Sequence, residues 1–109
     1  MSNKQTAIDY FFSFSSKDII SLQDFFDDHI ILRDWDIEAK GITDVLSANS
    51  SIFENVDQIE AIPLNILESD QTIIAELSIV INSLETLKVV DILEFSESGK
   101  IKAIRAYKG

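Results

Sequence analysis

The sequence predicts one α+β domain, in which helices come first and a mostly antiparallel sheet follows. Three observations support this prediction. Apolar residues recur at helical spacing in the first half, they alternate strictly in the second half, and 109 residues suffice for one domain but not for two. Apolar residues make up 46% of the chain, which is enough for a hydrophobic core. We therefore expect residues 1–109 to fold as one unit, with the helices covering one face of the sheet.

Two short helices are expected at the start of the chain. Tyr10 lies at the edge of the stripe that predicts the first helix, which consists of Ala7, Ile8, Phe11, Phe12 and Phe14. Ser15 and Asp18 indicate a break and a new N-cap, and the second helix is expected to end near Asp27 and Asp28. The aromatic residues of this region are expected in the core: Phe11, Phe12, Phe14, Phe25 and Phe26.

A short strand and a third helix come next. The alternation from His29 to Trp35 predicts a strand on which Ile30, Leu32 and Asp34 share one face. Gly41 precedes the third helix. Its buried side is expected to carry Ile42, Val45, Leu46, Asn49, Ile52, Phe53 and Val56.

Strands dominate the second half of the chain. Pro63 interrupts an alternation of Ile62, Leu64 and Ile66, which predicts an edge strand or a bulge. Longer alternations run from Ile73 to Ile81 and from Leu87 to Phe95, and a hairpin turn at Ser96–Gly99 leads to a last strand from Lys100 to Tyr107. We expect this sheet to bend strongly over the three helices and to leave a cavity at its open end.

Charge and composition exclude several classes of partner. The net charge is −10, and the nine basic residues are scattered, so the surface is expected to repel nucleic acid and anionic membranes. No apolar run approaches the roughly 20 residues of a membrane span, and a cytoplasmic location is expected. Cysteine is absent and His29 is the only histidine, so no metal site is expected.

Two carboxylates occupy positions where apolar residues are expected. Asp91 falls in register with aliphatic neighbours on one predicted strand, and Asp34 does so on another. A buried carboxyl group must be hydrogen-bonded, protonated or functional, because burial of an unpaired charge costs several kcal/mol. A protonated Asp91 and the Tyr10 hydroxyl would be two hydrogen-bond donors, and an ionised Asp34 would be a base. This set suits removal of a proton from carbon next to a carbonyl, with the donors stabilising the enolate oxygen.

Two segments resemble the NTF2-like superfamily, in particular its SnoaL-like and ketosteroid-isomerase-like groups. The segment from Tyr10 to His29 is similar to the family's opening helices and acidic corner, and Val90–Tyr107, with its Gly99-Lys100-Ile101 turn, is similar to its final hairpin. The resemblance implies a cystatin-like cone, in which three N-terminal helices pack against a strongly bent, mostly antiparallel sheet. It also implies an isomerase without a cofactor, with Tyr10 and Asp91 as oxyanion donors and Asp34 as general base.

Some positions depart from the isomerase pattern. Phe26 and Asn49 stand where the isomerases carry further tyrosines, Trp35 replaces a proline, and the loop from Asp36 to Lys40 is shorter. Four further residues are expected to line the pocket: Phe14, Trp35, Asn49 and Phe53.

Three functions therefore compete. The first is proton transfer on a small apolar ligand, the second is binding of such a ligand without turnover, and the third is a SnoaL-type polyketide cyclisation. An alternative for Asp91 is an ion pair with Arg105 on the neighbouring strand. A homodimer through the outer face of the sheet is also expected, because Val80, Val90 and Ile92 would otherwise form an exposed apolar patch.

Overall fold

A computed structural model describes residues 2–109 and confirms the α+β class. The elements follow the chain in this order: α1 (Asn3–Ser15), α2 (Ile19–Phe25), β1 (Phe26–Arg33), β2 (Glu38–Lys40), α3 (Ile42–Glu54), β3 (Ile59–Ser69), β4 (Thr72–Ile81), β5 (Glu85–Phe95) and β6 (Ile101–Lys108). The strands form one sheet in the order β2-β1-β6-β5-β4-β3. Neighbouring strands are antiparallel except for β1 and β6, which are parallel.

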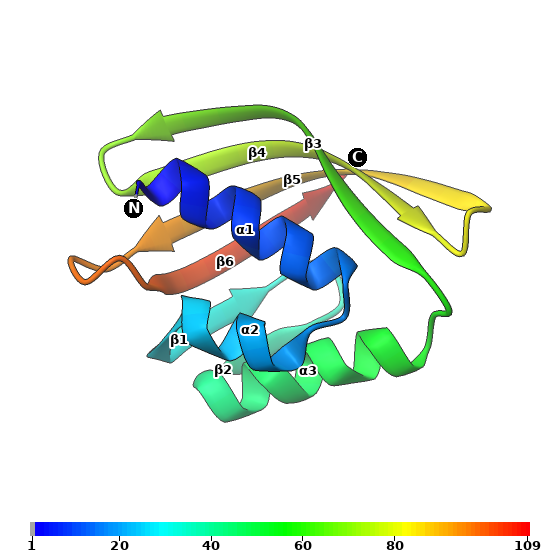
Figure 1. Ribbon diagram of the computed structural model, residues 1–109, viewed down its shortest axis with the longest axis horizontal. Coiled ribbons are helices and arrows are strands. Elements are labelled where there is room, and N and C mark those ends of the chain that lie inside the picture. Colours follow the sequence, from blue (N-terminus) through cyan, green and yellow to red (C-terminus); the bar gives the residue numbers. More distant parts are fainter. Residues whose placement is uncertain (1) are drawn as a thin grey trace.

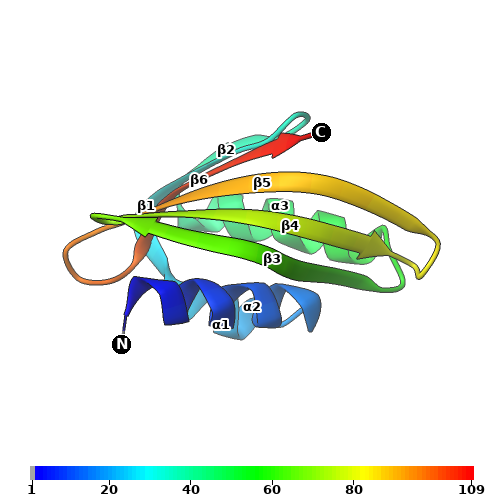
Figure 2. The same ribbon diagram turned by 90° about the horizontal axis from the view of Figure 1, so that it is seen from above.

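The helices lie on the concave side of the curved sheet (Figures 1 and 2). Helix α1 crosses β3 and β4, whereas α3 runs along β1 and β2 at the other end of the sheet, and α2 links the two helices. Between these layers lies the hydrophobic core, which includes Leu22, Ile30, Val45, Ile73, Leu77, Leu93, Phe95 and Ile101. Within residues 2–109, no helix combines the length and the apolar character needed to cross a membrane.

Local hydrogen bonds explain where the helices begin. The Ser2 hydroxyl accepts from the Gln5 N–H at 3.0 Å at the start of α1, and the Asp18 carboxylate accepts from the Ser21 N–H at 3.1 Å at the start of α2. Asp18 also accepts from the Ser21 hydroxyl, and these bonds lower the pKa of Asp18. Gly41 precedes α3 with φ 88°, a conformation that favours glycine. The break and new N-cap predicted from Ser15 and Asp18 lie at these residues, with Ser15 ending α1 and Asp18 capping α2, and α3 starts directly after Gly41 as predicted.

The strand alternations of the second half are confirmed. The inward-facing residues of β4 pair in register with those of β5, so that Ala75 lies opposite Asp91 and Leu77 opposite Val89. The proline-containing strand β3 is an edge strand, and its register shifts between Pro63 and Asn65. This bulge explains how Ile62 can be exposed although Ile66 packs against the core.

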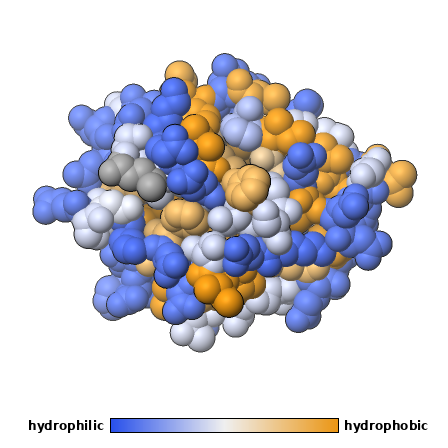
Figure 3. Space-filling view, in the orientation of Figure 1, coloured by the Kyte–Doolittle hydropathy of each residue, from blue (hydrophilic) through white to orange (hydrophobic). Residues whose placement is uncertain are grey.

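The prediction that Phe12 belongs to the core was wrong. Phe12 is 73% exposed and Ile8 is also exposed, whereas the neighbouring Phe11 is buried. Helix α1 packs against β3 along a narrow face, and successive residues of a helix point about 100° apart, so Phe12 faces solvent. Figure 3 shows that apolar side chains on this side of the molecule are interspersed with hydrophilic ones.

The predicted bounds of the first strand were also wrong. Strand β1 begins at Phe26 rather than at His29, and it ends at Arg33, before Asp34 and Trp35. A short strand, β2, follows where a loop was expected, and Leu32 pairs with its Ala39. Strand β2 has only three residues, and so short an alternation of polar and apolar side chains does not predict a strand from sequence.

Candidate functional site

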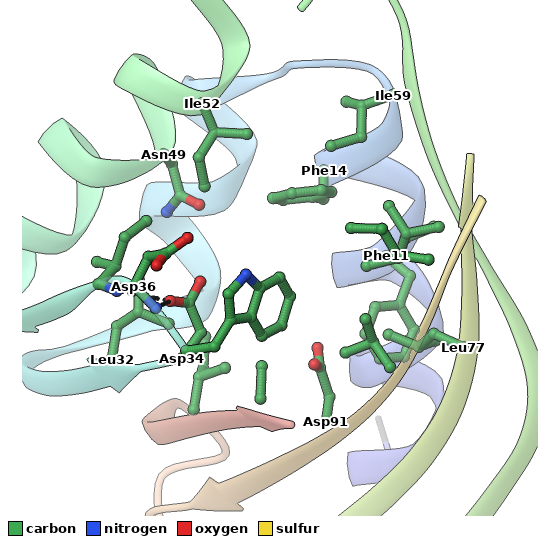
Figure 4. A pocket seen from close by; sticks show the side chains of 18 of the residues that line it. Phe11, Phe14, Leu32, Asp34, Asp36, Asn49, Ile52, Ile59, Leu77 and Asp91 are labelled. Carbon is green, nitrogen blue, oxygen red and sulfur yellow. Dashed lines mark hydrogen bonds between the residues drawn. The ribbon is translucent and has the colours of Figure 1, made fainter. Parts of the chain in front are cut away.

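A cavity of about 220 Å³ lies between α1, α3, the β1–β2 turn and the inner face of the sheet. Its lining is mostly apolar, with few polar side chains (Figure 4). Helix α1 contributes Tyr10, the β1–β2 turn contributes Asp34, Trp35 and Asp36, α3 contributes Asn49, and β5 contributes Asp91. The structure therefore brings the three predicted catalytic residues Tyr10, Asp34 and Asp91 to one cavity.

Asp91 is a buried carboxyl group without a hydrogen-bond partner among residues 2–109. Its side chain is 8% exposed and lies on the inner face of β5, between Ala75 of β4 and Ala106 of β6. These small neighbours leave room above the carboxyl group. In the part of the chain that the structure describes, every side-chain nitrogen or oxygen that water cannot reach has a partner, so the unpaired oxygens of Asp91 must be open to the cavity.

The alternative ion pair between Asp91 and Arg105 is absent. Arg105 pairs in register with Ile92, so its side chain lies on the outer face of the sheet, opposite to that of Asp91. There it forms an ion pair with Glu94. The strict alternation of a strand thus separates Arg105 from the cavity.

The electrostatic environment keeps Asp91 largely protonated at mildly acidic pH and partly protonated at neutral pH. Burial is the main cause, because a low-dielectric surrounding disfavours the charged form, and the charge of Asp34 adds to it. Together they raise the pKa of Asp91 from 3.8 to about 7. The carboxyl group can therefore donate a hydrogen bond near neutral pH, and its coupling to Asp34 indicates that the two groups lie close enough to interact.

Tyr10 presents its hydroxyl to the same cavity. Its ring is 5% exposed and packs against Phe11, Phe14 and Phe26, at centroid distances of 5.3, 6.4 and 5.9 Å. The hydroxyl has no partner among residues 2–109, so it too is open to the cavity. Burial, and to a lesser extent the charge of Asp91, raises the pKa of Tyr10 far above its ordinary value. Tyr10 is consequently a hydrogen-bond donor at every physiological pH.

Asp34 follows the end of β1, and a tight turn fixes its side chain. Its Oδ1 accepts from the backbone N–H groups of Asp36 at 2.7 Å and Ile37 at 2.6 Å, and the Asp34 N–H donates to the Ile37 carbonyl at 2.9 Å. This arrangement leaves Oδ2 as the free oxygen of the carboxylate. The turn thus holds Asp34 at the cavity, although the predicted strand does not extend to it.

Three of the four predicted pocket residues line the cavity: Phe14, Trp35 and Asn49. Phe53 is not among the lining residues; its ring packs edge-on against Phe14 at 5.1 Å. Trp35 is 40% exposed, and the Nζ atom of Lys108 stands 5.3 Å from its ring centroid. Sequence reasoning missed Asp36 and Ile37, although two aspartates separated by one residue are a common signal for a turn of this kind.

Comparison with known proteins gives information on the fold but not on the sequence family. No family model matches this sequence, and no curated protein matches it. Solved structures do match over almost the whole chain. An NTF2-like protein of unknown function from Cytophaga hutchinsonii has a TM-score of 0.85 at 8% identity, covering 100% of this chain and 91% of its own. The helices, the curved sheet and the cavity thus define a protein of the NTF2-like, cystatin-like fold.

Other solved structures with this fold carry candidate enzyme assignments. A candidate isomerase of the SnoaL-like family from Agrobacterium tumefaciens has a TM-score of 0.86 at 8% identity and covers 100% of this chain and 99% of its own. A candidate ketosteroid isomerase from Kribbella flavida has a TM-score of 0.83 at 14% identity, over 98% of this chain and 77% of its own. The predicted resemblance in fold is confirmed, and the activities belong to those proteins.

Proposed function

We propose that this chain is an enzyme without a cofactor that moves a proton on carbon next to a carbonyl group, as ketosteroid isomerases do. The observation that carries the proposal is the convergence on one apolar cavity of two unpaired donors, Tyr10 and Asp91, and one free carboxylate oxygen, Asp34 Oδ2. Buried polar groups without partners are costly to the fold, which favours a role in holding a ligand.

The proposed reaction uses each of the three groups once. Asp34 Oδ2 removes the proton from the carbon next to the carbonyl, and the electron pair moves onto the carbonyl oxygen. Tyr10 and protonated Asp91 donate hydrogen bonds to the resulting enolate oxygen, which stabilises its charge in a site sheltered from water. Asp34 then returns the proton to the same carbon or to a conjugated one, and the carbonyl group is restored.

The size of the cavity limits the substrate. Its volume of about 220 Å³ is below the ~300–1,000 Å³ that is typical of pockets for drug-sized ligands. We therefore propose a ligand of one or two fused rings rather than a four-ring steroid. A bicyclic ketone such as β-tetralone is a suitable probe.

Exchange of the α-protons of β-tetralone in deuterated water, followed by proton NMR, tests the activity. Asp34→Asn should abolish enzyme-dependent exchange because an amide is not a base. Its oxygen can still accept the two N–H bonds of the turn, so the fold and the binding of the enolate analogue β-naphthol should persist. Glu38→Gln removes an exposed carboxylate from the adjacent strand and is the matched control. Exchange that survives Asp34→Asn would rule out Asp34 as the base.

A second candidate function is binding of a small apolar ligand without turnover. The turn at Asp34 favours it, because two N–H bonds to one carboxylate oxygen give Asp34 a structural role independent of any reaction. The absence of the additional tyrosines at Phe26 and Asn49 favours it as well. Tight binding of β-naphthol without any β-tetralone exchange would select this function.

We also propose that the chain forms a homodimer through the outer face of the sheet. Val90 pairs with Tyr107 and Ile74 with Ile92 on this face, and the first three of these residues are each more than a third exposed. Ile31, Ile62 and Leu67 add further exposed apolar surface from β1 and β3. Exposed apolar surface of this kind is typical of a protein interface.

A further inference from the structure

Asn49 is a buried polar residue whose amide oxygen has no partner in the described part of the chain. Its side chain is 3% exposed, and its Nδ2 donates to the Val45 carbonyl one turn earlier on α3, at 3.0 Å. A carbonyl oxygen can only accept a hydrogen bond, so Nδ2 rather than Oδ1 must face Val45. Figure 4 shows the oxygen of Asn49 turned toward the cavity. Because all fully inaccessible polar atoms of residues 2–109 are paired, Oδ1 must be open to that space.

The wall around Asn49 is rich in hydrogen-bond acceptors. Asp36 and Asp34 lie on the same side of the cavity as Asn49, and Asp34 Oδ2 and both carboxylate oxygens of Asp36 are without protein partners among residues 2–109. The lining of the described chain includes no lysine, arginine or histidine, and the cationic Lys108 stands over the Trp35 ring instead. The opposite wall is apolar, with Phe11, Phe14 and Leu77 among its residues, as Figure 4 shows.

This asymmetry constrains the ligand. A hydrocarbon edge placed against Asn49 would take Oδ1 away from water and leave it without any hydrogen bond, which is unfavourable. An anionic edge would meet the charges of Asp34 and Asp36. A hydroxyl group or a protonated amine would instead satisfy the free acceptors. The Asn49 wall therefore differs from the Asp91 and Tyr10 end of the cavity, which offers donors.

We propose that the ligand carries, besides the carbonyl oxygen held by Tyr10 and Asp91, a hydroxyl or ammonium group that donates a hydrogen bond to Asn49 Oδ1. This inference rests on the proposed function, because it assumes that the carbonyl end lies at Asp91. It makes Asn49 a specificity-determining residue that selects oxygenated or aminated compounds over plain hydrocarbons of the same size.

Calorimetric titration with matched naphthols tests this inference. The parent probe is β-naphthol, and its derivatives carry on the far ring a hydroxyl, an aminomethyl group that is protonated at neutral pH, a methoxy group that cannot donate, or a carboxylate. At least one hydroxyl or amine derivative should bind about fivefold to twentyfold more tightly than β-naphthol, as expected for one hydrogen bond to a buried acceptor. The methoxy and carboxylate derivatives should bind no more tightly than the parent. A preference for the amine that weakens with added salt would identify the donor as a cation.

The Asn49→Leu variant provides the second measurement. Leucine is similar in size but has no acceptor, so the preference for the hydroxyl or amine derivative over β-naphthol should disappear, because the donor group loses its partner and the hydrocarbon edge of β-naphthol no longer covers an unpaired oxygen. Equal affinities of the wild-type protein for the parent and all derivatives would overturn the inference without requiring a variant. So would a preference that persists in Asn49→Leu, or a lack of binding by every naphthol. Exchange of β-tetralone by Asp34 is measured separately, so its presence or absence decides the proposed function independently.

Discussion

The protonation of Asp91 should make the stability of the protein depend on pH in a direction unusual for an aspartate. The pKa of Asp91 is raised to about 7 in the folded chain and returns to its ordinary value of 3.8 on unfolding. Between these two values the folded chain retains a proton that the unfolded chain has released, so the free energy of unfolding falls as the pH rises. This contribution is fully present below about pH 4 and is lost by about pH 7.

The magnitude follows from the width of that range. Each pH unit over which only the folded state is protonated changes the free energy of unfolding by about 1.36 kcal/mol. The whole interval gives about 4 kcal/mol, and the interval from pH 5 to neutrality gives about 2–3 kcal/mol. The side chain is 8% exposed, so little solvent screening reduces these values. Water that enters the cavity solvates the ionised carboxylate and so reduces these contributions to the free energy of unfolding.

Urea denaturation of the wild-type protein and Asp91→Asn at pH 5 and pH 8 measures this effect. Asparagine keeps the size of the side chain but cannot ionise, and the remaining acids contribute similarly to both proteins and cancel in the difference. The variant should therefore gain about 2–3 kcal/mol relative to the wild-type protein between pH 5 and pH 8. A difference that does not change with pH would show that Asp91 is ionised throughout, and the proposed role of Asp91 as a donor would fail with it.

Three further predictions concern the helix, the site and the outer face. Tyr10→Phe should lower β-tetralone exchange about 100-fold to 1,000-fold with little loss of stability, because the hydroxyl has no partner among residues 2–109. Exchange that survives would favour a SnoaL-type mechanism. Phe11→Ala should destabilise the protein by about 3–5 kcal/mol in urea denaturation, and Phe12→Ala by less than about 0.5 kcal/mol; equal losses would contradict the packing of α1. Ile74→Glu should convert a dimer to a monomer in sedimentation velocity, and a wild-type monomer would exclude the proposed dimer.

Periodicity accounts for most of the fold that could be predicted. The alternation in β4 and β5 requires each residue to lie on a particular face, so Asp91 could be placed among Val89 and Leu93 without coordinates. Capping chemistry indicated a new helix start at Ser15 and Asp18, and α2 does start there, with the Asp18 carboxylate accepting from an N–H group of the first turn. These are local relations between residues near one another in the chain, which is why they can be derived from the sequence alone.

The candidate site depended on the tertiary structure. Asp34 lies beyond the end of β1, and a turn that the strand pattern did not predict brings it to the cavity with Asp36 and Ile37. The exposure of Phe12 likewise follows from the angle at which α1 crosses β3, which no periodicity specifies.

The sequence by itself determined the α+β class, the inward face of each long strand and the presence of a carboxyl group among aliphatic neighbours. Only the tertiary structure decided that Asp91 does not pair with Arg105, because the register of β6 places Arg105 on the opposite face of the sheet. It also decided that Tyr10, Asp34 and Asn49, from three different segments, open onto the same cavity as Asp91. Whether such distant groups converge depends on strand register and helix packing, which arise from long-range contacts rather than from local sequence.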